Sequence, residues 1–495
     1  MQQLILEPTR IVETSSTLLD VILTNVPEIH VKSGVGKISC SDHKLIYTCV
    51  KVNDKPRQEH NLIRFRSYRN FQPEFFIHDL KNKLNTDFLE NINQENLIDS
   101  WSKLKNDFVH ISNEHAPIRK MRLKLRLNPW MTIEIRKLMY ERDCVKEQAD
   151  GDKTSDLHKE YKILRNRVTK EIQTAKENYF KDGFNEAGKD SKKKSKLIKR
   201  LLCQDRHAKI PSKLTADKFN DFFASIGKKT VANIIDENNK PDLKWKYGKS
   251  LNNFVFNDFD EYDVFRLLRS LGEDSSNDVL DMDAKLITVS SHILSPFVTK
   301  IFNISIRCGI VIEDWKLSRV TPIYKGKGDV LDESNYRPIS VIGHLPKVLE
   351  KLVKKQLMRH LVENDLISID QSAYRQAHNT QTSLHKVIED WLDNLSDKLL
   401  TGICLLDISK CFDTISHDLL LKKMNYYGIS GIENMWFKSY LSQRTQVVSC
   451  NGKISKRQNI EIGVPQGSVL GPVLFLIFVN DLPNNVNLGS CNMYA

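Results

Sequence analysis

An aspartate in the C-terminal part of the chain stands where a metal ligand could lie. Asp407 directly follows residues 401–406, an apolar run that we expect to form a strand, and a helix should begin near Ser416. An aspartate at the end of a strand often faces a cleft, where its carboxylate can bind a metal ion. A turn or N-cap aspartate has the same sequence context, so this segment alone leaves both interpretations open.

A second candidate site is the glycine-rich loop at residues 463–472. Gln466 is followed there by Gly467, and glycine lets the backbone approach a ligand closely. The apolar residues 469–479 that come next predict a buried helix or strand. Upstream of the loop, Asn451-Gly452 lies between β-rich arms and predicts a hairpin turn.

Two cations mark a third candidate site. Lys325 precedes Gly326 and Gly328, and Arg337 lies in the run Asn335-Tyr336-Arg337-Pro338-Ile339-Ser340. Cations on a glycine-rich hairpin suit a triphosphate, because ammonium and guanidinium groups form charge-assisted hydrogen bonds with phosphate oxygens. A surface loop without a ligand is the alternative.

In this order, the three segments resemble the reverse transcriptase domain of non-LTR (LINE-type) retrotransposons, especially jockey-like elements. The similarity runs through residues 301–303, 315–316, 336–340, 371–375, 407–413 and 465–468. The final residues, Met493-Tyr494-Ala495, resemble the start of the Tyr-Ala-Asp-Asp motif of that family. The resemblance implies an α+β fold, with the fingers and palm of a right-hand polymerase built around an antiparallel sheet that carries helices on one face.

The resemblance also implies roles for individual residues. In the full-length enzyme, two Mg²⁺ ions would support nucleotidyl transfer, with the Asp407 carboxylate and the Ile408 carbonyl as ligands. Phe412 would exclude the ribose 2′-hydroxyl and so select deoxynucleotides, with a core aromatic as the alternative. The residues expected to contact the nucleotide or the template are Lys325, Arg337, Phe412, Gln466 and Gly467.

The N-terminal residues carry a second resemblance. Leu19-Asp20-Val21 and Ser41-Asp42-His43 are similar to the end of the AP-endonuclease-like domain that precedes the polymerase in these elements. His43 would contact the scissile phosphate, Asp20 would orient His43, and Asp42 matches the neighbouring catalytic aspartate. The other nuclease residues of the family would precede Met1, so we expect no nicking activity from this chain.

The middle of the chain is expected to be helical and basic. Apolar residues from Leu157 to Tyr179 recur at helical spacing, and a helix over residues 132–147 would complete a hairpin through a turn at 150–152. Residues 119–126 hold five basic residues and no acid, and residues 189–213 hold ten basic residues and two acids. These runs are either solvated linkers or phosphate-binding surfaces. The candidates for nucleic-acid binding are Lys192, Lys193, Lys194, Lys199 and Arg200.

The composition excludes several classes of protein. The chain has 495 residues, 74 Lys+Arg and 62 Asp+Glu, which gives a net charge of +12 and favours a polyanionic partner. No apolar run reaches the roughly 20 residues of a membrane span, so we expect no membrane partner. The nine cysteines form no C-x-x-C pair, which argues against a disulfide framework or a zinc site and favours a reduced intracellular compartment. For a retrotransposon ribonucleoprotein, this means the nucleus and cytoplasm.

These observations predict four parts. Residues 1–52 would be the β-rich remnant of an endonuclease/exonuclease/phosphatase α/β sandwich, with strands at residues 18–23 and 45–47, and residues 53–250 a basic helical linker. Residues 251–303 would extend the polymerase, and residues 304–495 would form its fingers and part of its palm. We expect RNA-directed DNA synthesis primed from nicked target DNA, with template RNA, DNA and dNTPs as partners. Because the Asp-Asp pair would follow Ala495, this chain alone is expected to be inactive.

A non-enzymatic nucleic-acid-binding remnant or domesticated copy is the main alternative. It would bind RNA in a salt-sensitive way that does not depend on Asp407. A group II intron maturase or a telomerase-like enzyme shares the polymerase motifs but does not account for Ser41-Asp42-His43.

Overall fold

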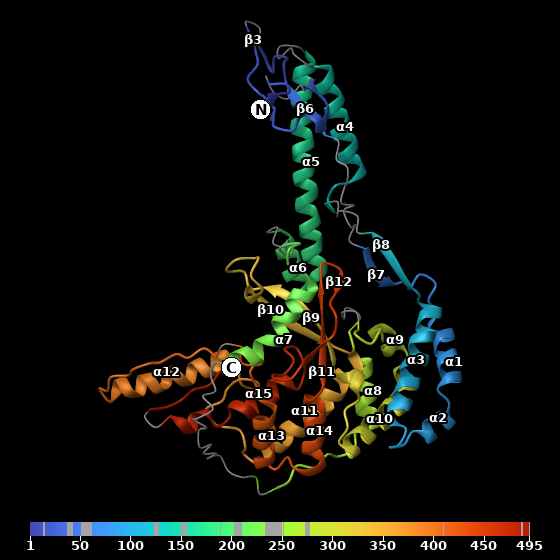
Figure 1. Ribbon diagram of the computed structural model, residues 1–495, viewed down its shortest axis with the longest axis vertical. Coiled ribbons are helices and arrows are strands. Elements are labelled where there is room, and N and C mark those ends of the chain that lie inside the picture. The colour runs from blue at the N-terminus through green and yellow to red at the C-terminus, as the bar shows by residue number, and fades with distance from the viewer. Residues whose placement is uncertain are drawn as a thin grey trace. The chain divides into compact units, whose positions relative to one another are not determined.

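The computed structural model describes residues 1–12, 15–36, 43–50, 62–122, 128–149, 156–188, 190–201, 210–232, 250, 252–272, 278–408, 410–486 and 489–494. The chain divides into two compact units (Figure 1). The first unit comprises residues 1–63 and 121–208, and the second comprises residues 64–120 and 209–495. The four predicted boundaries stay predictions, but much of the expected linker belongs to the second unit.

Short antiparallel strand pairs make up the start of the first unit. β1 pairs with β4, β2 with β3, and β5 with β6. Their bounds are β1 Gln2–Gln3, β2 Arg10–Val12, β3 Ser15–Thr17, β4 Leu23–Thr24, β5 His30–Gly36 and β6 Leu45–Val50. The strand expected at residues 45–47 is thus confirmed as the start of β6.

The strand expected at residues 18–23 is wrong for most of its length. Only its last residue, Leu23, lies in a strand, β4. The side-chain oxygen of Thr9 accepts the N–H groups of both Leu19 (3.0 Å) and Asp20 (2.9 Å), so these groups are not available for a strand ladder.

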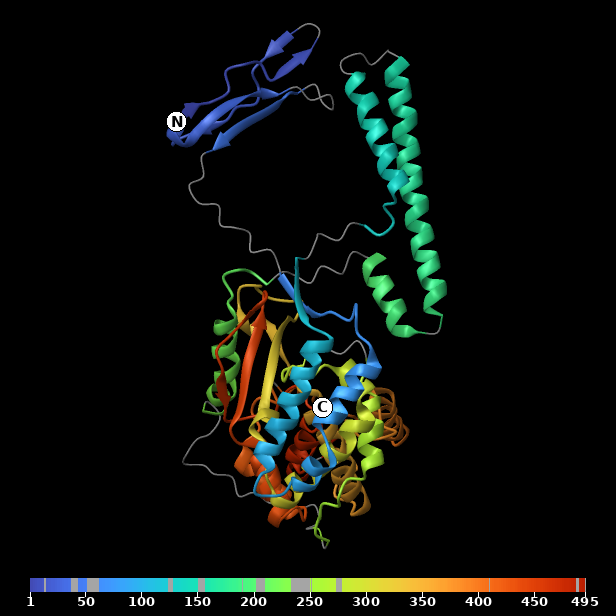
Figure 2. The same cartoon turned by 90° about the vertical axis from the view of Figure 1, so that its right-hand side faces the viewer.

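Two helices of the first unit run side by side, as the apolar stripe predicted (Figure 2). α4 (Ile133–Gln148) is capped by the Thr132 side chain, and α5 spans Asp156–Ala187. Trp130 packs on Tyr179 and Phe180 with ring centroids 5.8 and 5.9 Å apart. The turn expected at residues 150–152 lies outside the described residues. α6 (Ser191–Leu201) follows α5 and packs against it.

A five-stranded sheet organises the second unit, in the order β10-β9-β11-β12 with β13 also paired to β11. Its strands are β9 Leu317–Tyr324, β10 Tyr336–Ile342, β11 Arg444–Cys450, β12 Lys453–Ile454 and β13 Gln458–Ile460. β9 and β11 are parallel, so the sheet is mixed and the expectation of an antiparallel sheet is wrong. The predicted hairpin turn is confirmed, because Asn451 (φ 51°) and Gly452 (φ 78°) have the left-handed conformations of a type I′ turn between β11 and β12.

Helix α7 (Ala216–Ala232) covers one face of this sheet (Figure 2). Phe219 and Phe223 lie one helical turn apart and pack on Tyr336 and Val448 of the sheet. β11 alternates buried and half-buried residues along its length, as expected for a strand with one covered face. Asn220 Nδ2 donates to Ser455 Oγ (3.0 Å) and to the carbonyl oxygen of Lys456 (2.7 Å), so α7 is fixed to the sheet.

The remaining helices, apart from α12 (Thr380–Ser396), pack around one apolar core. They are α1 (Pro73–Lys83), α2 (Thr86–Asn91), α3 (Leu97–His115), α8 (Glu261–Arg269), α9 (Ala284–Val289), α10 (Ser291–Cys308), α11 (His344–Glu363), α13 (His417–Tyr426), α14 (Gly431–Leu441) and α15 (Gly471–Val479). α15 confirms the helical interpretation of residues 469–479, and α13 begins after its predicted cap Ser416. α12 contrasts with the others because it contributes no buried residue.

The helices α1 to α3, expected to be linker, pack against the polymerase-like residues. Trp101 of α3 stacks edge-on against Trp315 with ring centroids 5.2 Å apart, and its Nε1 donates to Asp314 (3.0 Å). Lys105 forms an ion pair with the same carboxylate. β7 (Leu62–Arg66) and β8 (Ile118–Arg122), which precede and follow these helices in the chain, pair with each other. Among the described residues, no helix is long and apolar enough to span a membrane.

Candidate active site

The loop at residues 463–468 is fastened to the turn at residues 410–415. The N–H of Gly463 donates to the Ile415 carbonyl (2.9 Å), and the N–H of Val464 donates to the Phe412 carbonyl (2.8 Å). Gly463 has φ +89°, and a Cβ there would lie 2.7 Å from the Phe412 oxygen. A Cβ would clash at this distance, so glycine at position 463 allows the two segments to meet.

Strand β10 holds the same loop from another side. The N–H of Ser340 donates to the Gln466 carbonyl (2.7 Å). Gly467 has φ +114°, and a Cβ there would lie 2.4 Å from the Ser340 oxygen. The Gln466-Gly467 pair predicted from the sequence therefore lies directly against the hairpin that carries Lys325 and Arg337.

Asp413 is a site residue that the sequence analysis missed. Its two oxygens lie 3.4 and 3.3 Å from Nε2 of Gln466. Burial raises the pKa of Asp413 to about 6, although the Lys410 cation, the Gln466 amide and the Lys325 cation oppose the rise. Gly227 of α7 packs against the Asp413 backbone, where a Cβ would meet its carbonyl oxygen at 2.2 Å. A carboxyl group with this pKa can gain or lose a proton near neutral pH.

A buried network supports the loop from below. Glu350 of α11 accepts hydrogen bonds from the N–H groups of Val469 (2.6 Å) and Leu470 (3.2 Å) and from the Tyr440 hydroxyl (2.8 Å). Burial raises the pKa of Glu350, and the Arg444 guanidinium opposes this rise. Arg444 itself is buried and stacks over the Tyr440 ring at 4.7 Å. These hydrogen bonds fix the residues that precede α15. The spacing of residues in the sequence did not predict this network.

A small cavity of about 40 Å³ lies beside Asp413 and Gln466. Ser340 and Arg444 also line it, together with Gly227 of α7. This volume has room for a water molecule or two and for no larger ligand. A nucleotide would therefore have to bind outside it, on the exposed side of the loop.

The segment that carries Asp407 differs from the expectation. Residues 401–408 form no strand, because they pair with no other strand among the described residues, and Leu405 (92 % exposed) and Leu406 (85 %) face solvent. Asp407 is exposed as well. Burial is the main cause of the raised pKa of Cys411, and the negative charges of Asp413 and Asp407 raise it further. Both carboxylates therefore lie near the turn that contains Cys411.

Phe412 lies at the junction of three predicted segments. Its ring centroid is 5.1 Å from that of Phe475 in α15 and 6.5 Å from that of Tyr374. Burial raises the pKa of Tyr374, and Cys411 and Tyr494 add to the rise. Met493 pairs with Gln371 in a parallel bridge. The structure thus brings together residues 371–375, 407–413 and 493–494, although the gate role of Phe412 stays a prediction.

The two predicted phosphate-binding cations lie on the β9–β10 hairpin. Arg337 is in β10 opposite Ile323 and is exposed. Lys325 follows β9, and its Nζ donates to the Ser334 carbonyl (2.7 Å), which holds the side chain along the hairpin. The hydrogen bond between Ser340 and Gln466 joins this hairpin to the glycine-rich loop, and the Lys325 cation is near enough to lower the pKa of Asp413.

The N-terminal candidates are brought together only in part. His43 Nδ1 lies 2.7 Å from Asp20 Oδ2, as expected if Asp20 orients the ring. The hydrogen bonds to Asp20 from His43 and then from Thr9 lower the pKa of the carboxyl. Asp42 lies outside the described residues. Of the basic candidates, Lys193 and Lys194 are exposed on α6, whereas the side chains of Lys192, Lys199 and Arg200 lie outside the described part.

The described residues offer limited metal-binding capacity. The donors at the predicted site are the exposed Asp407 carboxylate and the Ile408 carbonyl, both hard oxygen ligands that suit Mg²⁺. Across the described part of the chain, no group of three or more His, Cys, Asp or Glu side chains is placed to hold a metal ion. The donor chemistry fits, but the described residues supply only part of a coordination shell.

Comparison with known proteins covers the C-terminal part of the chain. Residues 324–495 match the family model "Reverse transcriptase (RNA-dependent DNA polymerase)". A probable RNA-directed DNA polymerase from transposon BS of Drosophila melanogaster is 32 % identical over 194 residues, which cover 38 % of this chain and 20 % of the relative. The RNA-directed DNA polymerase from mobile element jockey of Drosophila funebris is 35 % identical over 188 residues, with shares of 38 % and 20 %. The chain spans about a fifth of the length of these relatives.

Proposed function

Because residues 324–495 are a reverse transcriptase domain related to those of LINE-type, jockey-like retrotransposons, we propose that they act in RNA-directed DNA synthesis primed from nicked target DNA. The observation that carries the proposal is the attachment of the Gln466-Gly467 loop to both β10 and the Phe412-Asp413 turn. This attachment supports the proposal, because it joins the hairpin of Lys325 and Arg337, the Gln466-Gly467 loop and the Phe412 turn to one another through backbone hydrogen bonds. Rigid placement of such groups is what a polymerase needs for positioning a nucleotide.

In this proposal each candidate has one task. Lys325 and Arg337 bind the triphosphate, since both are exposed cations on one hairpin. Gln466 and Gly467 contact the nucleotide and the template. Phe412, supported from beneath by Phe475, blocks the 2′-hydroxyl of a ribonucleotide.

Reverse transcriptases use a divalent metal ion, typically Mg²⁺, and two ions are proposed here. The Asp407 carboxylate and the Ile408 carbonyl would hold the metal, which would neutralise charge on the transferred phosphate and activate the primer hydroxyl. Asp413 is a poor candidate for the same task, because its raised pKa and its contact with Gln466 favour a positioning role. A second ion would need carboxylates beyond those that the described residues place beside Asp407.

We further propose that the first unit derives from an endonuclease and a nucleic-acid-binding hairpin. The 2.7 Å contact between His43 and Asp20 supports the first part. The exposed Lys193 and Lys194 on α6 support the second. Template RNA and target DNA are the proposed partners, and the nucleus and cytoplasm are the proposed locations.

Ternary complex formation tests the proposal without requiring catalysis. A DNA primer ended by a dideoxynucleotide is annealed to an RNA template, and the chain is added with Mg²⁺ and each dNTP in turn. The dNTP that matches the template should slow complex dissociation at least tenfold relative to the other three. Lys325→Gln should abolish this selectivity, whereas Lys327→Gln, an exposed cation on the same hairpin, should not. Equal effects of all four dNTPs, or of the two variants, would contradict the proposal.

One observation favours the non-enzymatic alternative: Asp407 is exposed, and the described residues place no group of three metal-binding side chains around it. It predicts RNA binding with no effect of the matched dNTP and no effect of Asp407→Asn. Incorporation of dTTP on poly(rA)–oligo(dT) that is lost in Asp407→Asn would exclude it.

A further inference from the structure

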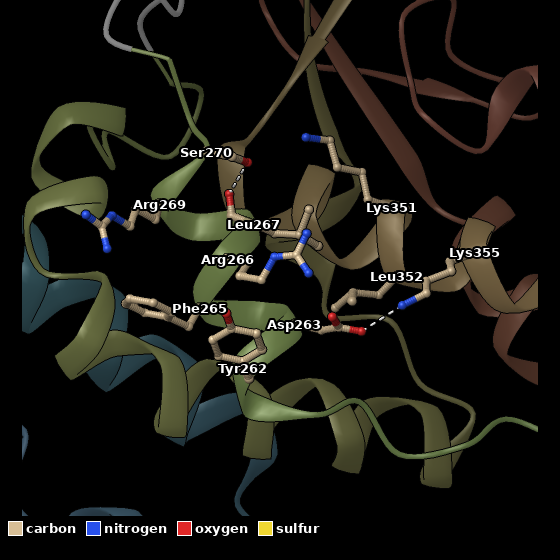
Figure 3. A pocket seen from close by; sticks show the side chains of 10 residues that line it. All are labelled: Tyr262, Asp263, Phe265, Arg266, Leu267, Arg269, Ser270, Lys351, Leu352 and Lys355. Carbon is tan, nitrogen blue, oxygen red and sulfur yellow. Dashed lines mark hydrogen bonds and ion pairs between the residues drawn. The ribbon is translucent and has the colours of Figure 1, made fainter.

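Helices α8 and α11 border an open cavity of about 590 Å³ that shares no residue with the candidate active site (Figure 3). Its apolar lining comes from Leu352, which is 4 % exposed, and from the half-buried Leu267. The other lining residues are aromatic, charged or small and polar. The cavity therefore has an apolar base and a polar rim.

The charge of this cavity is strongly positive. Four of its lining residues are cations, Arg266 and Arg269 on α8 and Lys351 and Lys355 on α11, against one carboxylate, Asp263. Asp263 already pairs with Lys355 at 2.8 Å. For Arg266, Arg269 and Lys351, the described residues contain no carboxylate within ion-pair distance. Three exposed cations thus remain available for an anionic ligand.

The cations are arranged in rows along the two helices. Arg266 and Arg269 are three residues apart on α8, and Lys351 and Lys355 are four residues apart on α11, so the Cβ atoms in each pair should lie about 5–6 Å apart. Figure 3 shows the Arg266 and Lys351 side chains on the same side of α8, with Arg269 at the opposite rim. A linear polyanion could contact the rows in succession, whereas a single small anion would leave most of them unused.

An exposed aromatic ring accompanies the cations. Tyr262 is 64 % exposed, lies 6.4 Å from the Phe265 ring and carries the Arg266 guanidinium over its face at 5.9 Å. Exposed aromatic rings beside cations are typical of surfaces that bind single-stranded nucleic acid, because each base can stack on the ring while its phosphates meet the cations. A lipid surface or an acidic protein would not require such a ring.

We propose that the α8–α11 groove binds single-stranded nucleic acid. Its phosphates contact Arg266, Arg269 and Lys351, and one base stacks on Tyr262. The proposed polymerase function motivates the kind of ligand, but the groove uses none of the residues that the polymerase proposal uses. The two proposals can therefore fail separately.

The test uses the full chain and labelled 20-nucleotide single strands of RNA and of DNA, with a duplex of the same sequence as reference. Fluorescence anisotropy measures affinity, and 4-thiouridine crosslinking followed by peptide mapping locates the contact. The double variant Arg266→Gln, Lys351→Gln removes two groove cations. Lys81→Gln, Lys83→Gln removes two exposed cations of α1 and serves as the matched control.

The groove variant should weaken single-strand binding at least tenfold relative to the control and should remove the crosslink to α8. Tyr262→Leu keeps an apolar side chain and should weaken single-strand binding about fivefold or more, with little change for the duplex. Equal binding of RNA and DNA would indicate phosphate and stacking contacts alone, and a preference for RNA would add a 2′-hydroxyl contact; both support the proposal.

Any one of four results would overturn it. The groove variant could behave like the α1 control, or the crosslinks could map only outside α8 and α11. Tyr262→Leu could also leave single-strand and duplex binding unchanged. Loss of binding to phosphatidylserine vesicles in the groove variant, with RNA binding intact, would instead assign the groove to a membrane surface and would equally overturn the proposal.

Discussion

The buried carboxyl of Asp278 makes the stability of the second unit depend on pH. Asp278 is 6 % exposed and accepts the N–H groups of Val279 (2.9 Å), Met282 (3.2 Å) and His344 (3.1 Å), the first residue of α11. Burial nevertheless raises its pKa from 3.8 to about 6, and none of the described residues forms an ion pair with it. The folded state therefore binds this proton more tightly than the unfolded state does.

The sign and size of the effect follow from this shift. The contribution of Asp278 to stability is full below pH 3.8 and is lost as the pH rises through about 6. The whole shift corresponds to about 3 kcal/mol, and the part that falls between pH 4.5 and 7.5 to about 2 kcal/mol. Asp278→Asn removes the titration. Its amide group faces the Met282 N–H, which costs about 1–2 kcal/mol at every pH.

Urea unfolding of the natural chain and of Asp278→Asn at pH 4.5, 6.0 and 7.5 measures this difference. The natural chain should be the more stable at pH 4.5, and its advantage should shrink by about 2 kcal/mol at pH 7.5. Asp393→Asn, at an exposed position of α12, is the control and should show no such trend. A difference between Asp278→Asn and the natural chain that stays constant with pH would refute the reasoning.

Three further predictions concern the candidate active site. Tyr440→Phe leaves the buried Glu350 carboxylate without its 2.8 Å hydrogen bond and should lower the free energy of unfolding by about 2 kcal/mol in urea titrations; an unchanged value would contradict the network. Gly467→Ala should abolish the effect of the matched dNTP on ternary complexes, because the new Cβ would lie 2.4 Å from a carbonyl oxygen of β10, whereas Gly272→Ala, with no atom within 4 Å of the new Cβ, should keep it. Phe412→Val should raise the affinity of the ternary complex for the matched ribonucleotide at least tenfold without changing that for the dNTP, and unchanged discrimination would remove Phe412 from the gate.

Local signals in the sequence were sufficient for the elements that depend on local structure. The stripe from Leu157 to Tyr179 predicted α5, and Ser416 marked the start of α13. The Asn451-Gly452 pair predicted the hairpin turn correctly, because both residues tolerate the positive φ that the turn requires. In each case, the determining interactions lie within a few residues of one another.

Elements that depend on distant partners could not be predicted in the same way. Residues 401–406 have the composition of a strand, but a strand also needs a neighbour, and composition does not supply one. The amphipathic α7 gave no indication that the sheet would be its partner. Asp413 was missed for a related reason, because its raised pKa comes from burial by segments such as residues 463–466 that lie far along the chain.

The position of α7 has a consequence for biosynthesis. The Asn220 side chain donates a hydrogen bond to Ser455, a residue that is translated 235 residues later. At about 5–20 residues per second, a ribosome needs roughly 12–47 s to make the intervening chain. During that time Phe219 and Phe223 have no sheet to cover them, so the nascent helix exposes an apolar face to chaperones or to other chains. Completion of β11 to β13 should therefore be the event that commits the second unit to its native fold.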